Sequence, residues 1–209
     1  MKGLILKDLL LIKGNARYIL IFLVIFGLIA LEGNDVLYFI PAFISMMMFM
    51  TTFSYDEYNK WDAYAVTLPI KKENIVLSKY VGSTILLGIA LILTFIISLV
   101  VGLVTEQLDM QKNITLLLGC GGAVLLVEAI MYPLLIKFGV EKGRIWVFLG
   151  IFLSSFIIGF IFQKASFTIP ENLMTFLSQY LPWLLAAALL LILIISYTIS
   201  KKLYLKKEF

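Results

Sequence analysis

One acidic residue of this chain lies inside an apolar stretch. Glu128 is the only charged residue between Ile114 and Ile136. An ionisable side chain within hydrocarbon costs at least ~2.5–3.5 kcal/mol, so it should face a partner or a cavity. Two interpretations stay open: a polar position on a translocation path or proton-sensitive gate, or a carboxyl that fixes one helix against another. Pro133, about one turn later, is expected to bend this helix and to free a backbone carbonyl nearby.

Several kinds of chemistry are excluded by the residues that the chain lacks. It contains no histidine, which removes Ser–His hydrolases and the usual zinc proteases. The single cysteine, Cys120, allows no intrachain disulfide and no metal cluster, and we interpret it as a small helix-packing residue. No G-x-x-x-x-G-K-[ST] pattern occurs, so the chain lacks the loop and lysine that hold nucleotide phosphates. We therefore predict no catalytic residues, no metal and no cofactor for this chain.

The densest mixture of charged and aromatic side chains lies between Tyr55 and Tyr64. Aromatic residues anchor protein interfaces, while charges set their register. Tyr58, Trp61 and Tyr64 are spaced by three, so on one continuous helix they would form a single aromatic edge. The alternative is an amphipathic loop at the lipid headgroups, where Trp and Tyr are also enriched.

The elements that carry these residues are predicted to be transmembrane helices. The 209 residues are 62% hydrophobic and only 14% charged, whereas a soluble domain is about 25% charged. This composition excludes a soluble enzyme, a disordered chain and a nucleic-acid-binding domain. Since about 20 apolar residues span a bilayer, we predict an all-α membrane protein with one domain over 1–209 and six spans. Their approximate bounds are 18–31, 36–53, 81–104, 114–136, 145–162 and 181–199.

The distribution of basic residues predicts the orientation. Fifteen of the 17 Lys and Arg residues fall on one side of the predicted spans, and basic residues favour the cytoplasmic side. Both termini are therefore predicted to be cytoplasmic, and Met1–Lys13 is predicted to be an interfacial helix. On the other side, Thr168 and Glu171 fit a helix start, which predicts a short amphipathic helix before the sixth span. Its two interpretations are an interfacial anchor and a lid over a substrate exit.

The second predicted span has a methionine-rich centre. Met46, Met47, Met48 and Met50 occur within five residues. Because Met adapts to irregular neighbours, Met47 and Met50 could line an apolar translocation path together with Glu128. Lipid-facing or core packing is the alternative.

The order of several short segments resembles a known family. These segments are Leu6-Lys7-Asp8, Trp61-Asp62, Leu68–Val76, Ser78-Lys79-Tyr80, Pro133 and Lys137–Arg144. Together with the length and six predicted spans, they are similar to the compact ABC-2 type transporter permeases, in particular the small Gram-positive group that includes permeases of the phenol-soluble modulin exporter.

The resemblance implies a plasma-membrane subunit that pairs with a second permease copy or homologue. It also implies separate ABC ATPase subunits, which would hold ATP and Mg²⁺. In that family the internal loop after the second span carries a helix that docks on the ATPase, here about Tyr55–Ala65, and a second contact corresponds to Phe138–Arg144. The implied ATPase-coupling residues are Asp56, Glu57, Tyr58, Trp61, Asp62, Gly139, Glu141 and Arg144.

The function expected from these features is the permease half of an ATP-driven exporter. Its mostly hydrophobic spans suit an amphipathic peptide or another hydrophobic substrate, besides the surrounding membrane lipids. Two other classes stay open: a non-transporting scaffold or sensor subunit, and a proton-coupled carrier that uses Glu128. Carriers usually show internal repeats and several intramembrane polar sites, which this sequence does not show clearly.

Overall fold

The computed structural model describes residues 2–14, 16–31, 35–106, 109–164 and 171–207. Within these ranges the chain is helical and contains no strand, which confirms the predicted all-α class. The helices are α1 (Lys2–Lys13), α2 (Ala16–Ala30), α3 (Val36–Tyr58), α4 (Trp61–Thr67), α5 (Lys72–Val104), α6 (Met110–Phe138), α7 (Val140–Lys164) and α8 (Glu171–Lys206).

Four of these helices are long and apolar enough to cross a membrane: Leu37–Tyr58, Lys72–Val104, Met110–Phe138 and Trp183–Lys206. They match four of the predicted spans. The predicted span 18–31 coincides with α2, whose apolar part, Leu20–Ala30, is shorter. The predicted span 145–162 coincides with α7, which includes side chains outside the described part of the chain. The protein is thus multi-pass, and the count of six stays a prediction.

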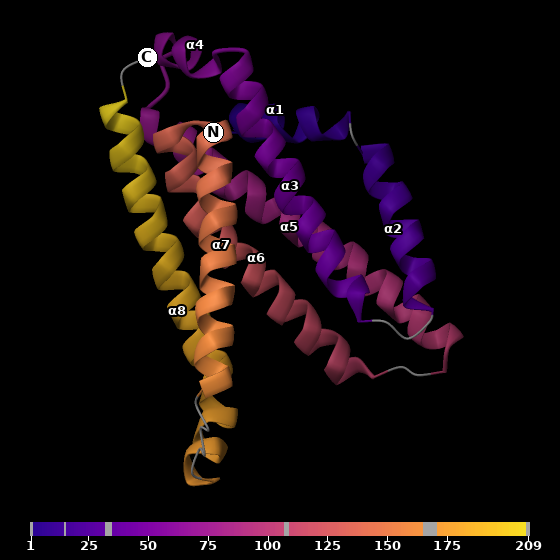
Figure 1. Ribbon diagram of the computed structural model, residues 1–209. Helices are drawn as coiled ribbons and strands as arrows, with labels where there is room; N and C mark the ends of the chain where they lie inside the picture. Colours follow the sequence, from indigo (N-terminus) through magenta and orange to yellow (C-terminus); the bar gives the residue numbers. More distant parts are fainter. Residues whose placement is uncertain (1, 15, 32–34, 107–108, 165–170, 208–209) are drawn as a thin grey trace.

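Both termini and the short helix α4 lie at one end of the molecule (Figure 1), which we call the basic end. Helices α3 and α5 extend there beyond the predicted spans, α3 to Tyr58 and α5 from Lys72. At ~1.5 Å per residue, α5 exceeds the ~30 Å of hydrocarbon in a bilayer. The extra turns therefore raise α4 above the rest of the bundle.

Helix α1 lies at the basic end beside α3 and α5 (Figure 1). Its inward face consists of Leu4, Asp8 and Ile12, which are all buried. These residues are four apart, so they lie on one face of the helix. The helix matches the predicted segment Met1–Lys13 from residue 2 onward.

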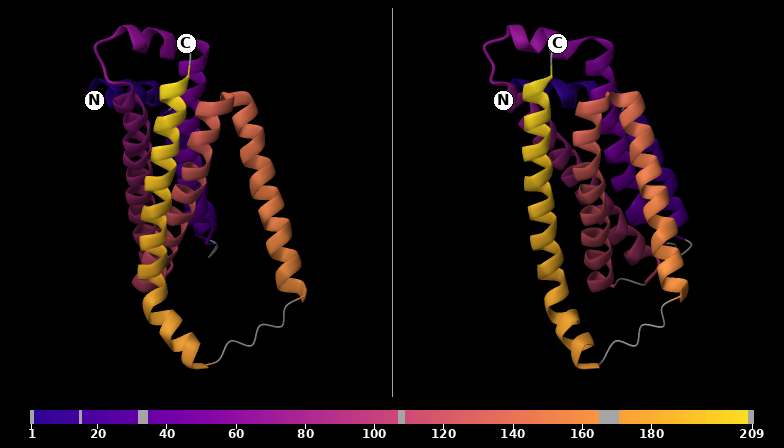
Figure 2. Two further views of the ribbon diagram at one scale, coloured as in Figure 1. Left: turned by 90° about the vertical axis from the view of Figure 1, so that its left-hand side faces the viewer. Right: turned by 60° about the vertical axis from the view of Figure 1, so that its left-hand side comes forward.

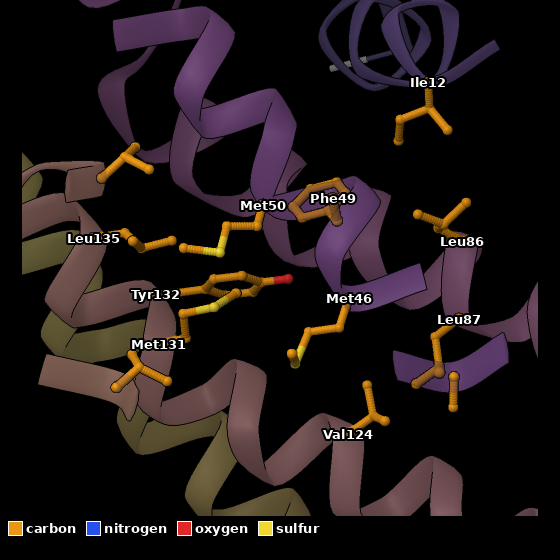
Figure 3. Close-up of a cluster of buried hydrophobic side chains, with 13 residues drawn as sticks. Ile12, Met46, Phe49, Met50, Leu86, Leu87, Val124, Met131, Tyr132 and Leu135 are labelled. Carbon is orange, nitrogen blue, oxygen red and sulfur yellow. The ribbon is translucent and has the colours of Figure 1, made fainter. Parts of the chain in front are cut away.

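The main core forms where α3 crosses α6 (Figure 3). Phe49 and Met50 of α3 pack with Met131, Tyr132 and Leu135 of α6, and all five are at most 6% exposed. The ring centroids of Phe49 and Tyr132 are 6.0 Å apart. The methionine-rich centre of α3 therefore contributes to this core.

Helix α6 lies between α7 and α8 (Figure 2). Helix α8 is continuous from Glu171 to Lys206. The predicted division into a short amphipathic helix and a sixth span is therefore wrong, because the chain stays helical through Pro182. The predicted Thr168 cap lies outside the described residues.

Candidate functional site

The segment from Tyr55 to Ala65 is two helices at an angle and not one. Tyr58 ends α3 and Trp61 begins α4. Between them, Lys60 has a φ of 50°, in the left-handed region, which an α-helix of L-residues does not continue through. The predicted single aromatic edge through Tyr58, Trp61 and Tyr64 is therefore wrong. Sequence spacing could not show this break, because neither Asn59 nor Lys60 is a strong helix breaker.

The three aromatic side chains differ in exposure. Tyr58 is 86% exposed and Tyr64 is 56% exposed. Trp61 is partly buried, and Lys7 Nζ lies over its ring, 4.3 Å from the centroid. Trp61 also packs against the small core of Ala65, Ile75 and their neighbours. Trp61 thus anchors α4 to α1 and α5, while the two tyrosines are available for an external contact.

A cluster of four charges, three of them buried, joins α1, α3 and α5. Lys79 Nζ lies 3.0 Å from Asp8 Oδ1 and 2.6 Å from Asp56 Oδ2. Lys7 Nζ lies 2.5 Å from Asp56 Oδ1 and 3.2 Å from Asp8 Oδ1. Asp8 is fully buried, and Asp56 and Lys79 are 9% and 6% exposed. Two positive and two negative charges balance, as burial of ions requires.

This charge cluster places Asp56 inside the protein. Lys79 is further held by the hydroxyl of Thr52, at 3.3 Å, and by the ring of Phe53, whose centroid is 4.9 Å away. The sequence predicted Asp56 as a coupling residue but did not predict its partners. The available signal was the position of Asp8 and Lys79, which are charged residues on helix faces that are otherwise apolar or small.

The loops that follow α3 and precede α7 meet at Glu57. Its Oε2 accepts a hydrogen bond of 2.7 Å from the backbone N–H of Val140, the first residue of α7. Such N–H groups have no partner within the helix, and a carboxylate there is favourable. Gly139 has a φ of 78°, and a Cβ at this position would lie 2.9 Å from Glu57 Oε1. The positive φ thus favours glycine, and any larger residue would also shift the Glu57 carboxylate from its present place.

Helix α4 is also tied to the C-terminal end of α8. The carboxylate of Asp62 accepts a hydrogen bond of 3.0 Å from the Tyr204 hydroxyl. The other oxygen of Asp62 lies 3.1 Å from Lys207 Nζ. Asp62 therefore fixes α4 from within the molecule.

The predicted coupling residues consequently fall into two groups. Asp56, Glu57, Trp61, Asp62 and Gly139 make or shape contacts within the chain. The others, Tyr58, Glu141 and Arg144, are exposed. Because Glu57 joins the end of α3 to the start of α7, these three residues belong to neighbouring segments. We call Tyr58, Tyr64, Glu141 and Arg144 the coupling surface.

Glu128 lies in the interior of the bundle and is 2% exposed. Its carboxyl group faces the hydroxyl groups of Ser83 on α5 and Tyr132 on α6. Of the residues proposed to share a path with it, Met50 is 6% exposed and belongs to the core, while Met47 packs on the edge of that core. Ser83 Oγ donates to the Tyr80 carbonyl at 3.0 Å, and the buried Tyr132 hydroxyl has no hydrogen-bond partner within the described residues. The structure thus places Glu128 beside two hydroxyl groups in the interior rather than on an open surface.

A second polar group links α6 and α8. Pro133 has no N–H, so the carbonyl of Ala129, four residues earlier, lacks its helical partner. Ser196 of α8 donates a hydrogen bond to this carbonyl. The Tyr80 hydroxyl lies 2.6 Å from Ser196 Oγ and 2.8 Å from Ser200 Oγ, which adds α5 to the group. The freed carbonyl was predicted from Pro133, but its partner was not.

In the described part of the chain, no three His, Cys, Asp or Glu side chains are placed to hold a metal ion. Cys120 is buried and forms no disulfide.

Comparison with known proteins gives one family. The family model described as "ABC-2 family transporter protein" matches residues 3–205, which is nearly the whole chain. No curated protein and no solved structure matches the chain.

Proposed function

Because the chain belongs to the ABC-2 family of transporter proteins, we propose that it is the permease subunit of an ATP-driven exporter in the plasma membrane. The family supplies the class of protein. The direction of transport follows the resemblance described above. The docking of partners rests on the arrangement of the basic end, and the substrate class rests on the apolar helices.

The observation that carries the proposal is the junction at Glu57. Glu57 connects the end of α3 with the start of α7. These are the two segments that the family resemblance implies to contact the ATPase. A force on either segment is therefore transmitted to the other. We propose that separate ABC ATPase subunits, which bind ATP and Mg²⁺, dock on the coupling surface at the cytoplasmic end of the bundle.

The contacts within the basic end extend this coupling to most of the bundle. The charge cluster connects α3 to α1 and α5, and Asp62 connects α4 to α8. In this arrangement Tyr58, Glu141 and Arg144 contact the ATPase, while Asp56, Glu57, Trp61, Asp62 and Gly139 position them. The prediction that Trp61 is an external anchor thus changes to an internal role.

We further propose that transport proceeds through a dimer of this chain, or of this chain with a homologue. The substrate class that suits the apolar helices is an amphipathic peptide or another hydrophobic molecule, because few charged side chains lie between the ends of the bundle. Met47, Met50 and Glu128 lie at or near the contact of α3 with α5 and α6. A path that uses these residues therefore requires these helices to separate.

Affinity purification of the tagged chain from its native membranes, followed by mass spectrometry, tests the docking. We expect an ABC ATPase to co-purify, and we expect Tyr58→Ala to reduce its recovery by about tenfold, since a well-buried interface tyrosine contributes ~1–2 kcal/mol or more. Tyr18→Ala is the matched control, because Tyr18 is an exposed tyrosine on α2. Recovery of no ABC ATPase, or equal recovery with both variants, would contradict the proposed surface.

A further inference from the structure

A cavity of about 320 Å³ lies between α1, α2, α3 and α5. Its walls are formed by apolar side chains, with Leu20 and Phe26 from α2, Ile44 from α3 and Leu93 from α5 among them. The Ser45 hydroxyl in the wall donates to the Ala42 carbonyl at 2.7 Å, so it does not require water. An apolar cavity offers water too few hydrogen-bond partners to stay filled with it. An apolar group such as a hydrocarbon chain therefore suits this cavity better than water does.

The cavity opens toward the lipid and runs along the bundle. Leu20 and Ile89 line it and are also 61% and 46% exposed, so its wall reaches the outer surface. On α2, Leu20 and Phe26 are six residues apart, or about 9 Å along the helix axis. The lining residues therefore extend over at least this distance along the bundle and leave an opening at the side, which suits part of an acyl chain.

One charged residue lines the cavity. Lys13, the last residue of α1, lies at the basic end and is exposed. Lys13 forms no salt bridge within the described part of the chain, unlike Lys7, Lys79, Lys201 and Lys207. It differs from other lysines of this end without a salt bridge there, such as Lys2 and Lys202, because it lines the cavity. An unpaired cation beside an apolar cavity between helices favours an anionic headgroup.

We infer that this cavity binds one acyl chain of an anionic phospholipid of the adjacent leaflet, with Lys13 on the lipid phosphate. The bound chain then packs beneath α1 and stabilises its position on the membrane, because Leu9 and Ile12 of α1 form part of the cavity wall. This inference does not depend on the substrate or the direction of transport.

Photolabelling of the full-length chain in lipid nanodiscs tests the site. The probe is phosphatidylglycerol with a diazirine on one acyl chain, compared with phosphatidylcholine carrying the same chain. We expect mass spectrometry to place the label mainly on peptides that contain Leu20, Ile44 or Leu93. Labelling spread evenly over the exposed faces of α5 and α8 would overturn the inference. So would displacement of the label by an amphipathic peptide at a concentration far below that of the lipid, which would assign the cavity to substrate.

Two pairs of variants separate the cavity from the headgroup contact. Ala90→Phe places a ring in the cavity and should lower labelling by both probes at least fivefold, whereas Ala187→Phe, at an exposed position on α8, should not. Lys13→Gln should lower the preference for phosphatidylglycerol about fivefold, which corresponds to ~1 kcal/mol per lysine near anionic lipid. Lys202→Gln, at an exposed lysine of the same end, should leave the preference unchanged.

An unchanged preference in Lys13→Gln would overturn the assignment of the headgroup. Should Ala90→Phe fail to fold, the label map of the wild-type chain and the Lys13→Gln ratio still decide the inference, since neither changes a residue of the core.

Discussion

At the scale of single residues, the buried charges of the basic end should affect the stability of the protein more than its exposed charges do. A surface ion pair contributes little, because water screens it. The cluster of Lys7, Asp8, Asp56 and Lys79 is different, since Asp8 is fully buried and Lys79 is 6% exposed. Removing one member leaves an opposite charge without compensation in a poorly solvated position.

We expect Lys79→Met to lower the free energy of unfolding by ~3–5 kcal/mol, the cost of breaking a buried pair. Lys7→Met should cost less, because the Lys7 side chain is 23% exposed and water replaces part of its contacts. Adding Asp8→Asn to Lys79→Met should recover much of the loss, since one lysine and one aspartate then remain. Thermal unfolding in detergent measures all three, with Lys202→Met as the exposed control. No recovery in the double variant would show that the charges are not the cause.

Glu128 offers a second prediction at this scale. Since it is buried against the hydroxyl groups of Ser83 and Tyr132, we expect it to act in packing. Glu128→Gln keeps hydrogen-bonding capacity and should retain most folded protein and transport. Glu128→Leu removes the polar group nearest the Tyr132 hydroxyl, which has no other hydrogen-bond partner among the residues that the structure describes, and should cost ~1–3 kcal/mol of stability. Ser83 should lose little, because its hydroxyl donates to the Tyr80 carbonyl. Transport assays with matched amounts of folded protein measure this. Loss of transport in Glu128→Gln at a normal folded amount would place Glu128 on the path instead.

At the scale of helices, the length of apolar runs predicted helix positions better than loop residues or Pro182 did. The positions of α3, α5, α6 and α8 follow from stretches that can span hydrocarbon. The extra turns of α3 and α5 could not be predicted, because they contain polar residues whose partners lie far away in sequence. The break at Lys60 depends on a left-handed backbone, which tertiary contacts of Trp61 and Asp62 favour and local sequence does not.

The contact between α6 and α8 gives the prediction for this scale. Ser196→Ala should lower stability by ~0.6–1.7 kcal/mol, the range for hydrogen bonds between membrane helices, because the Ala129 carbonyl loses its donor. Pro133→Ala restores a backbone N–H that can bond to the same carbonyl. In that background Ser196→Ala should therefore cost clearly less. Unfolding of the four proteins of this cycle in detergent measures the difference, and equal losses in both backgrounds would show that Pro133 does not create the need for Ser196.

At the scale of the whole molecule, the sequence predicted a contact region at 55–65 and 138–144 but not which of its residues face inward. The aromatic and acidic content of 55–64 pointed to an interface, and the order of segments pointed to the family that the comparison then gave. Which side chains face inward depends on contacts across 49 to 145 positions of sequence, such as Lys7 with Asp56 and Asp62 with Lys207. A single sequence does not show which residues so far apart along the chain come into contact.

The last prediction tests whether the basic end moves as one body. Glu57→Ala removes the carboxylate that joins α3 to α7, but it leaves the exposed Tyr58 and Arg144 in place. We therefore expect the ATPase to co-purify within about twofold of the wild-type amount. Transport per ATP hydrolysed should fall by about five- to tenfold, since a helix-capping contact contributes ~1 kcal/mol or more. Glu57→Gln retains an oxygen acceptor for the Val140 N–H and should have a smaller effect.

The control for this experiment is Glu73→Ala, which removes an exposed carboxylate at the same end, 3.0 Å from Lys201. Its transport per ATP should equal that of the wild-type protein. Reconstitution in proteoliposomes with the co-purified ATPase measures hydrolysis and transport together. If transport per ATP is the same in Glu57→Ala as in Glu73→Ala, the two loops act independently. The proposed transmission through Glu57 is then wrong. If Glu57→Ala instead loses the ATPase altogether, Glu57 belongs to the docking surface itself and not to the junction behind it.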